Sequence, residues 1–280
     1  MSGVDPPVAL TIAGSDSSGG AGIQADLATF AAHGVHGTSA ITAVTAQNTE
    51  GVHGVSHLPV EFVAAQMDAV LTDLGVDAVK TGMLGSAAVI ELVAETARRG
   101  ALPNLVVDPV LVATSGDRLL DSGSERSYLD LLREAQVITP NLWEAGVLLG
   151  RDLATVDDIR RAAAELAGLC PGYVVVTGGH LVGAAIDVVI HGQDLRELPA
   201  ARIATSNNHG SGCTFASAVA ARLARGVDVD EAVDGAKEFV RCRLRRSAAW
   251  QLGRGNGPVA HLCPDDWGDE GRSLGLRSNS

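Results

Sequence analysis

The sequence of 280 residues contains few aromatic residues and few cysteines, and each shortage narrows the class of protein. Phe, Tyr and Trp together make up 3%, so the core must be built from Ala, Val, Leu and Ile. Cys170, Cys213, Cys242 and Cys263 show neither CxxC spacing nor a paired histidine pattern, which argues against a zinc site. Four unpatterned cysteines in a chain of this length fit a reducing cytosol, and a core of this size needs no disulfides.

Long hydrophobic runs and a basic N-terminal region are also missing. No stretch reaches the roughly 18 apolar residues of a membrane span, and the N-terminus lacks the basic and apolar regions of a signal peptide. The net charge of −12 and the pI near 5.0 argue against nucleic-acid binding, which usually needs a basic patch. We therefore expect a cytoplasmic protein that binds neither nucleic acid nor membranes.

Lysine is the scarcest charged residue. Lys80 and Lys237 are the only lysines among 21 Lys and Arg residues, which leaves 19 arginines. A mutational bias towards arginine codons explains this shortage. The two remaining lysines are then candidates for positions where a compact, flexible charge is needed and a planar guanidinium does not serve.

Short apolar runs alternate with amphipathic stretches along the chain. Strands are expected at 8–13, 38–46, 76–80, 104–110, 136–140 and 172–179, with short antiparallel strands within 185–205. Helices are expected at 23–32, 60–74, 86–99, 124–135, 141–150, 155–169, 211–226 and 229–248. This order predicts one α/β domain over residues 1–262, with a central, mostly parallel sheet and helices on both faces. The polar, Gly- and Ser-rich segment 263–280 is expected to be a disordered tail.

Ligands of such sheets bind at the carboxyl ends of the strands, and the glycine-rich loops of this chain follow strands or open helices. The loop AGSDSSGGAG (13–22) is neither GxGxxG nor GxxxxGK[ST], so it is neither a Rossmann fingerprint nor a Walker loop. It either offers backbone to a flat substrate or is a flexible turn between a strand and a helix.

The segment NNHGSGCTFASAVAA (207–221) is more specific. Gly210, Ser211 and Gly212 precede a small-residue helix, and the backbone amides at a helix N-terminus form an anion site. Cys213 falls in the first helical turn, where the helix end lowers the pKa of a thiol. Its thiolate can accept a proton from a substrate hydroxyl. The alternative is that Cys213 is a small buried hydrophobic residue.

Three further segments offer polar groups after strands. NLWE places Asn141 and Glu144 on one helical face, which suits a Mg²⁺–phosphate site or, alternatively, a helix cap with a first-turn acid. Asp108 ends a strand before Pro109 and can polarise a metal-bound water or cap a turn. TGGH (177–180) lets backbone approach phosphate or forms a tight turn.

Together these segments resemble the hydroxymethylpyrimidine/phosphomethylpyrimidine kinases of thiamine biosynthesis, in the ribokinase-like superfamily. The resemblance covers residues 8–262 in order, with the motifs TIAGSDSSGGAGIQADLATF, ITAVTAQNTEGV, VKTGML, VVDPVLVATSGDRLL, ITPNLWEA, VTGGH, NHGSGCTFASA, EAVDGAKEFV and GRGNGPVAH. It implies a ribokinase-like α/β fold, usually a homodimer, that uses ATP and Mg²⁺. The implied activity is phosphorylation of 4-amino-5-hydroxymethyl-2-methylpyrimidine to its monophosphate and then to the diphosphate.

The resemblance also implies roles for single residues. Gln47 reads the pyrimidine edge, and the other expected substrate-binding residues are Ala21, Asp26, Thr45 and Met83. Cys213 is the expected base, and Gly210, Ser211 and Gly212 form the expected anion hole. The expected nucleotide-side residues are Asn141, Thr177, Thr205 and Lys237, and the expected metal-side residues are Asp108 and Glu144.

The chain departs from the family pattern at two positions. Thr177 and Ser206 stand where family members commonly have lysines, so two positive charges near the transferred phosphate are missing. A pyridoxal or pyridoxine kinase, which also phosphorylates a hydroxymethyl group, is the first alternative function. The second is a non-catalytic pyrimidine or nucleotide binder, which the missing charges favour and the intact GSGC and NLWE segments oppose.

Overall fold

The computed structural model describes residues 5–111, 125–179, 181, 183 and 185–262. The strands are β1 (Val8–Asp16), β2 (His36–Asn48), β3 (Gly51–His57), β4 (Ala78–Thr81), β5 (Val106–Val107), β6 (Val137–Ile138), β7 (Tyr173–Val176), β8 (Ala185–His191) and β9 (Asp194–Ala200). The helices are α1 (Gly22–Ala32), α2 (Val60–Asp73), α3 (Ala87–Arg98), α4 (Glu125–Leu132), α5 (Leu142–Leu149), α6 (Val156–Ala167), α7 (Ser211–Ala224) and α8 (Val229–Ser247). The expected tail and the first residue of the helix expected at 124–135 lie outside the described residues.

Within the described ranges these strands form one nine-stranded sheet in the order β3-β2-β1-β4-β5-β6-β7-β8-β9. The strands from β2 to β7 in this order pair in parallel, and β3, β8 and β9 pair antiparallel at the two edges. The predicted mostly parallel α/β fold is confirmed, and so are the antiparallel strands expected within 185–205.

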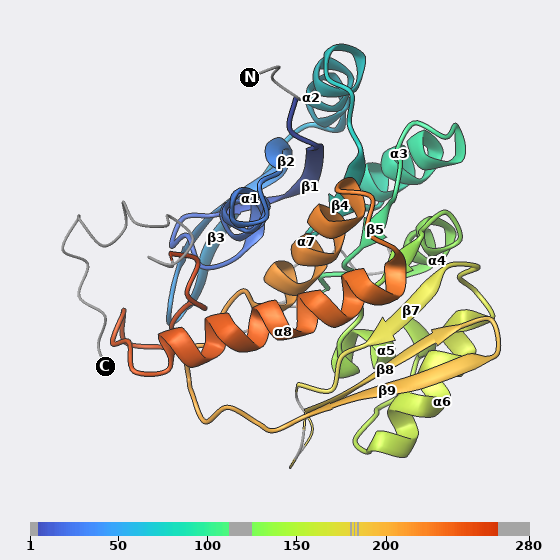
Figure 1. Ribbon diagram of the computed structural model, residues 1–280. Coiled ribbons are helices and arrows are strands. Elements are labelled where there is room, and N and C mark those ends of the chain that lie inside the picture. Colours follow the sequence, from blue (N-terminus) through green and yellow to red (C-terminus); the bar gives the residue numbers. More distant parts are fainter. Residues whose placement is uncertain (1–4, 112–124, 180, 182, 184, 263–280) are drawn as a thin grey trace.

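Helices cover both faces of the sheet because its strands bury alternate residues on opposite sides. On β1, Leu10 and Ile12 join a core with α2 to α6, whereas Ala9 joins a second core with α1, α7 and α8. Figure 1 shows α7 and α8 packed together on that second face. No helix of the described residues is long and apolar enough to cross a membrane.

The sequence patterns missed β3 and overestimated two inner strands. β3 is an exposed edge strand, so its sequence GVHGVSH needs no apolar alternation and shows none. The strands expected at 104–110 and 136–140 pair over only two residues each. Pro109 and Pro140 follow them closely, and a proline has no N–H to donate to a neighbouring strand.

Within the sheet, β2 lies next to β1 on one side, and β4, which comes later in the chain, lies next to β1 on the other side. This reversal of direction leaves a crevice beyond the carboxyl ends of β1 and β4, which is where ligands of such sheets bind. The fold therefore places the loops after β1, β4, β5, β6 and β7 around one region.

Candidate active site

A cavity of about 320 Å³ opens at these carboxyl ends. All the candidate residues except Asp26 line it: Ala21, Thr45, Gln47, Met83, Asp108, Asn141, Glu144, Thr177, Thr205, Gly210, Ser211, Gly212, Cys213 and Lys237. They come from strand ends, loops and helices that are far apart in the sequence. The fold gathers them because the carboxyl ends of parallel strands share one edge of the sheet.

Asp26 lies beneath the cavity, and the expectation that it contacts a substrate is corrected here. Its fully buried carboxylate accepts hydrogen bonds from Lys80 Nζ at 2.8 and 2.9 Å. The hydroxyls of Thr11 and Ser217 donate to it at 2.6 Å each. Because α1 turns this side chain inward, Asp26 holds Lys80 in place and does not face a ligand.

Lys80 places a permanent positive charge under the site. Its side chain is fully buried, and Nζ lies 4.0 Å from Asp108 Oδ2. Burial opposes the charge, but the nearby Asp26 carboxylate outweighs burial and raises the pKa of Lys80 above its usual value. A buried, paired ammonium of this kind requires a side chain that is compact at its tip, which supports the interpretation of the scarce lysines.

The GSGC segment forms the start of α7, as predicted. Gly210 is the N-cap residue with φ of 79°, and a Cβ there would lie 1.8 Å from the carbonyl oxygen of Gly20. Gly212 is different, because a Cβ on it would meet no atom of the described residues within 4 Å. Gly210 is thus required by the protein's own packing, whereas Gly212 leaves open space at the cavity wall.

Cys213 lies in the first turn of α7, but its thiol does not have the lowered pKa that its place in the helix suggests. The residue is partly accessible at the cavity wall, yet burial of the thiol is the largest influence and raises its pKa to about 12. The positive charge of Lys80 and the N–H of Gly22 act in the opposite direction and do not compensate. The ligand-free protein therefore holds a protonated thiol at neutral pH, which corrects the expectation of a thiolate.

Asn141 and Glu144 form a capping box at the start of α5. Asn141 Oδ1 accepts from the N–H groups of Trp143 (2.9 Å) and Glu144 (3.0 Å), and Glu144 Oε2 accepts from the Asn141 N–H at 2.8 Å. The capping interpretation of NLWE is therefore confirmed, although both residues also line the cavity.

Asp108 and Glu144 are almost fully buried, so they are not carboxylates of an open cleft. Burial, followed by the charge of Asp108, raises the pKa of Glu144, and burial also raises the pKa of Asp108 against the opposing charge of Lys80. Within the described part of the chain, Asp108 Oδ2 has no hydrogen-bond partner. Two carboxyl groups with little compensating charge and an unsatisfied oxygen fit a divalent cation such as Mg²⁺.

The opposite end of the cavity carries basic groups. Lys237 pairs with Asp187 at 2.9 Å and donates to the carbonyl of Leu198, so it connects α8 to β8 and β9. Arg202 donates to the carbonyls of Gly179 (2.8 Å) and Gly183 (2.9 Å) in the loop after β7. Arg202 was not among the residues expected from the sequence, because one arginine among 19 carries no local signal.

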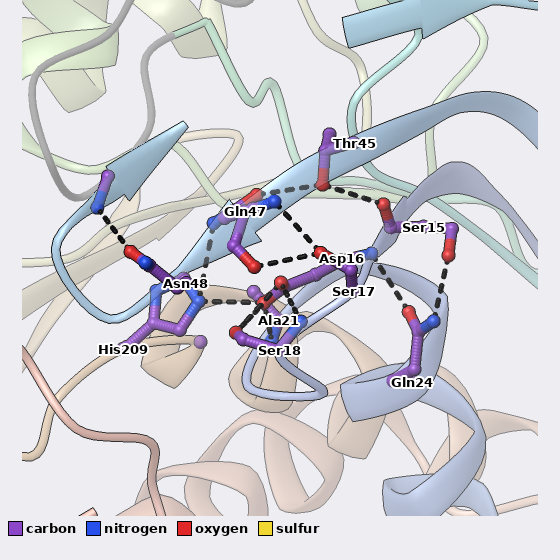
Figure 2. A network of polar contacts seen from close by, with 12 residues as sticks. Ser15, Asp16, Ser17, Ser18, Ala21, Gln24, Thr45, Gln47, Asn48 and His209 are labelled. Atoms are coloured by element: carbon purple, nitrogen blue, oxygen red, sulfur yellow. Dashed lines mark hydrogen bonds and ion pairs between the residues drawn. The ribbon is translucent and has the colours of Figure 1, made fainter. Parts of the chain in front are cut away.

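The end of the cavity around Gln47 carries a hydrogen-bonded network centred on Asp16 (Figure 2). Asp16 Oδ2 lies 2.8 Å from His209 Nε2 and accepts the N–H of Ala21 at 2.9 Å. The side-chain amide of Gln47 reaches the same histidine and lies 3.1 Å from the hydroxyl of Thr45. Asp16 and His209 both lie inside recognised motifs, but nothing in the sequence indicated that they form a pair.

Comparison with known proteins places the chain among vitamin kinases. The family model described as phosphomethylpyrimidine kinase matches residues 16–260. A hydroxymethylpyrimidine/phosphomethylpyrimidine kinase of Streptomyces coelicolor is 50% identical over 259 residues, which cover 92% of this chain and 95% of that protein. A probable chloroplastic thiamine biosynthetic bifunctional enzyme of Oryza sativa subsp. japonica is 46% identical over 92% of this chain, which spans about half (49%) of that relative.

Solved structures agree on the fold. A Bacillus subtilis pyridoxal kinase in complex with ADP superposes with a TM-score of 0.84 at 41% identity, over 92% of this chain and 98% of that one. The similarity therefore extends over nearly all of both chains.

Proposed function

The chain belongs to the phosphomethylpyrimidine kinase family, and from this premise we propose that it transfers a phosphoryl group from ATP to 4-amino-5-hydroxymethyl-2-methylpyrimidine. A second transfer to the resulting monophosphate gives the diphosphate, as a part of thiamine diphosphate biosynthesis. The observation that carries the proposal is that one cavity is lined by a primary amide (Gln47), an anion loop (210–213) and a pair of acids (Asp108 and Glu144).

The three groups have separate tasks in phosphoryl transfer, which depends on positioning and charge stabilisation. The primary amide of Gln47 offers a donor and an acceptor side by side, which match the edge of an aminopyrimidine. Ala21, Thr45 and Met83 line the same end of the cavity and complete the ring pocket. The backbone N–H groups of the anion loop stabilise charge on the transferred phosphoryl oxygens.

Asp108 and Glu144 hold Mg²⁺ in this proposal. The bound ion would neutralise negative charge of the ATP phosphates. Asn141, Thr177, Thr205 and Lys237 line the nucleotide end, and Arg202 adds a positive charge on that side. We propose that Arg202 partly replaces the positive charge of the two lysines that family members commonly have at positions 177 and 206.

Cys213 accepts the proton of the substrate hydroxymethyl group in the first transfer. Because the thiol is protonated in the ligand-free protein, it must first release its own proton to solvent before it can accept the proton of the hydroxymethyl group. Lys80, fixed beneath it by Asp26, is the permanent positive charge that favours the thiolate. We also propose that the enzyme is a homodimer and acts in the cytoplasm.

Pyridoxal phosphorylation is the second candidate activity. The favouring observation is the similarity to the Bacillus subtilis pyridoxal kinase, at 41% identity. Both reactions phosphorylate a hydroxymethyl group on a six-membered heteroaromatic ring, so the anion loop and the acids serve either one. Discrimination between the pyrimidine and pyridoxal must therefore come from the residues around Gln47 that contact the ring.

A direct test measures ADP production with the hydroxymethylpyrimidine, its monophosphate and pyridoxal in parallel, with and without Mg²⁺. Mass spectrometry of the products identifies the mono- and diphosphate. The proposal predicts turnover of both pyrimidines that requires Mg²⁺ and a preference for them over pyridoxal. Turnover of pyridoxal alone would replace the proposed function with its alternative, and turnover of none would reject both.

A further inference from the structure

Asp16 is the centre of a buried network that joins two distant segments of the chain. Its carboxylate is 3% exposed and accepts from the N–H of Ser18 (2.8 Å), the hydroxyl of Ser18 and the N–H of Ala21 (2.9 Å). The remaining partner is His209 Nε2 at 2.8 Å, which lies 193 residues further along the chain. Figure 2 shows Asp16 between these groups, with Gln47 next to the same histidine nitrogen.

The hydrogen bonds of Asp16 determine whether His209 Nε2 carries a hydrogen. Burial opposes ionisation of Asp16, but the hydrogen bonds from His209 and Ser18 outweigh burial and lower the pKa of this carboxyl. An ionised carboxylate can only accept hydrogen bonds. His209 Nε2 must therefore carry a hydrogen and direct it to Asp16, whether the ring is neutral or charged.

His209 is held firmly in this position. Its backbone N–H donates to the carbonyl of Gly257 at 3.0 Å, and its carbonyl accepts from the N–H of Val259 at 3.1 Å. The residue is 6% exposed. The C-terminal segment that follows α8 thus fixes the backbone on both sides of the ring, and Asp16 fixes the ring itself.

The hydrogen on His209 Nε2 determines the orientation of the Gln47 amide. Gln47 Nε2 lies 3.4 Å from His209 Nε2, and an Nε2–H that donates to Asp16 cannot accept from another N–H. A 180° rotation of the amide exchanges its nitrogen and oxygen without moving other atoms. Oε1, which bears no hydrogen, then lies beside the hydrogen that His209 Nε2 donates to Asp16, so that two N–H groups no longer oppose each other. The amide nitrogen then faces Thr45, whose hydroxyl donates to the carbonyl of Ser15 at 3.0 Å.

We infer that Asp16 and His209 are positioning residues that determine which way round Gln47 presents its donor and its acceptor to the substrate. This inference rests on the proposed function, because it concerns how that substrate is read. Each amide atom keeps one further hydrogen or lone pair for the cavity. An amino group beside a ring nitrogen can therefore pair with Gln47 in one direction only, which fixes the ring and the direction of its hydroxymethyl group.

The inference predicts selectivity for a donor beside an acceptor on the ring edge. The test compares kcat/KM for 4-amino-5-hydroxymethyl-2-methylpyrimidine with kcat/KM for the analogue that lacks the 4-amino group. In the wild type the amino compound should be favoured by roughly 10–100-fold, since the analogue leaves a buried polar atom unpaired. This ratio is the readout, because general loss of packing lowers both values together.

Two substitutions of His209 separate the hydrogen-bond donor from the size of the side chain. His209→Gln keeps an N–H at the position of Nε2, whereas His209→Met is of similar size and has none. The ratio should stay within about threefold of the wild type in His209→Gln and fall to about threefold or less in His209→Met, since only the first retains the donor. Asp16→Asn replaces one of the two acceptor oxygens with an NH₂ group, so the side chain is no longer an obligatory acceptor on both sides. It should reduce the ratio as His209→Met does, with the KM for ATP little changed.

The outcomes decide the inference in either direction. Equal ratios in His209→Met and the wild type, or equal losses in His209→Gln and His209→Met, would overturn it. If Asp16→Asn unfolds because Ser18 or Ala21 loses its acceptor oxygen, the two His209 variants still decide, since they leave those bonds intact. Wild-type protein that phosphorylates neither pyrimidine would reject the proposed function and this inference together, whereas an active wild type with unchanged ratios in the variants would reject the inference alone.

Discussion

Replacing Gly212 by alanine should separate catalysis from folding at the anion loop. The new Cβ would meet no atom of the described residues within 4 Å, so the folded protein accommodates it without strain. Gly212 lies within α7, where exchanging glycine for alanine stabilises a helix by up to about 1 kcal/mol. The thermal midpoint should therefore stay the same or rise slightly.

Activity should fall strongly in the same variant. Gly212 lines the cavity beside Cys213, and the open space at its Cα is where we place the transferred phosphoryl group. A methyl group there keeps phosphate oxygens away from the backbone N–H groups. Loss of one such donor typically costs about 10²–10³ in kcat.

Gly210→Ala is the matched control two residues earlier. Its φ of 79° costs an alanine roughly 1–2 kcal/mol, and its Cβ would lie 1.8 Å from the carbonyl oxygen of Gly20. Relieving such an overlap typically costs a further 1–3 kcal/mol or so. At about 2 °C for each kcal/mol in a domain of this size, the melting temperature should fall by roughly 4–10 °C.

Differential scanning fluorimetry and coupled ADP release on both purified variants test the reasoning. Gly212→Ala with more than half of the wild-type kcat would show that no phosphate approaches this backbone. Gly210→Ala with an unchanged melting temperature would show that the contact between the loops at Gly20 and Gly210 does not constrain the fold.

Three further predictions concern the acids and the thiol. Cys213→Ala should impair phosphorylation of the alcohol by about 10²–10⁴-fold, the usual contribution of a general base. It should spare the monophosphate to within about tenfold, because a phosphate oxygen is already ionised above its second pKa of about 6; equal losses in the two assays would mean that Cys213 only shapes the anion loop. In the ligand-free protein at pH 7.5, iodoacetamide should label the exposed Cys242 at least ~100-fold faster than Cys213, since the thiolate is the reactive form and the pKa of Cys213 is about 12. Peptide mapping measures both rates, and comparable rates would contradict the buried thiol. Glu144→Gln should leave the melting temperature nearly unchanged, because the pKa of Glu144 is already raised and glutamine keeps an acceptor for the Asn141 N–H. The Mg²⁺ concentration for half-maximal activity should rise about 10–100-fold, as is typical for altered metal-site partners, and an unchanged Mg²⁺ dependence would remove Glu144 from the metal side.

Local patterns in the sequence predicted the architecture, and of the candidate residues named from these patterns and from the family resemblance all but Asp26 line the cavity. The alternation of apolar runs and amphipathic stretches indicates βαβ units, and parallel strands bring their following loops to one edge of the sheet. Residues as distant as Ala21, Asp108 and Gly212 can therefore be assigned to one region from their places after strands or before helices. The helix cap at Asn141 is equally local, since its partners lie within three residues.

Burial and long-range pairing were decided by the tertiary structure alone. Asp26 follows the glycine-rich loop by a few residues, but the orientation of α1 turns it beneath the cavity to Lys80. Cys213 is at a helix N-terminus, where local rules lower the pKa of a thiol, yet burial raises it. Asp16 and His209 are 193 residues apart, and no spacing rule connects them. The sequence indicated many of the residues that reach the site, because places after strands and before helices depend on local periodicity and because the motifs resemble those of a known family. Their charges, hydrogens and partners depend on which atoms meet across the folded chain, and only the packed structure specifies them.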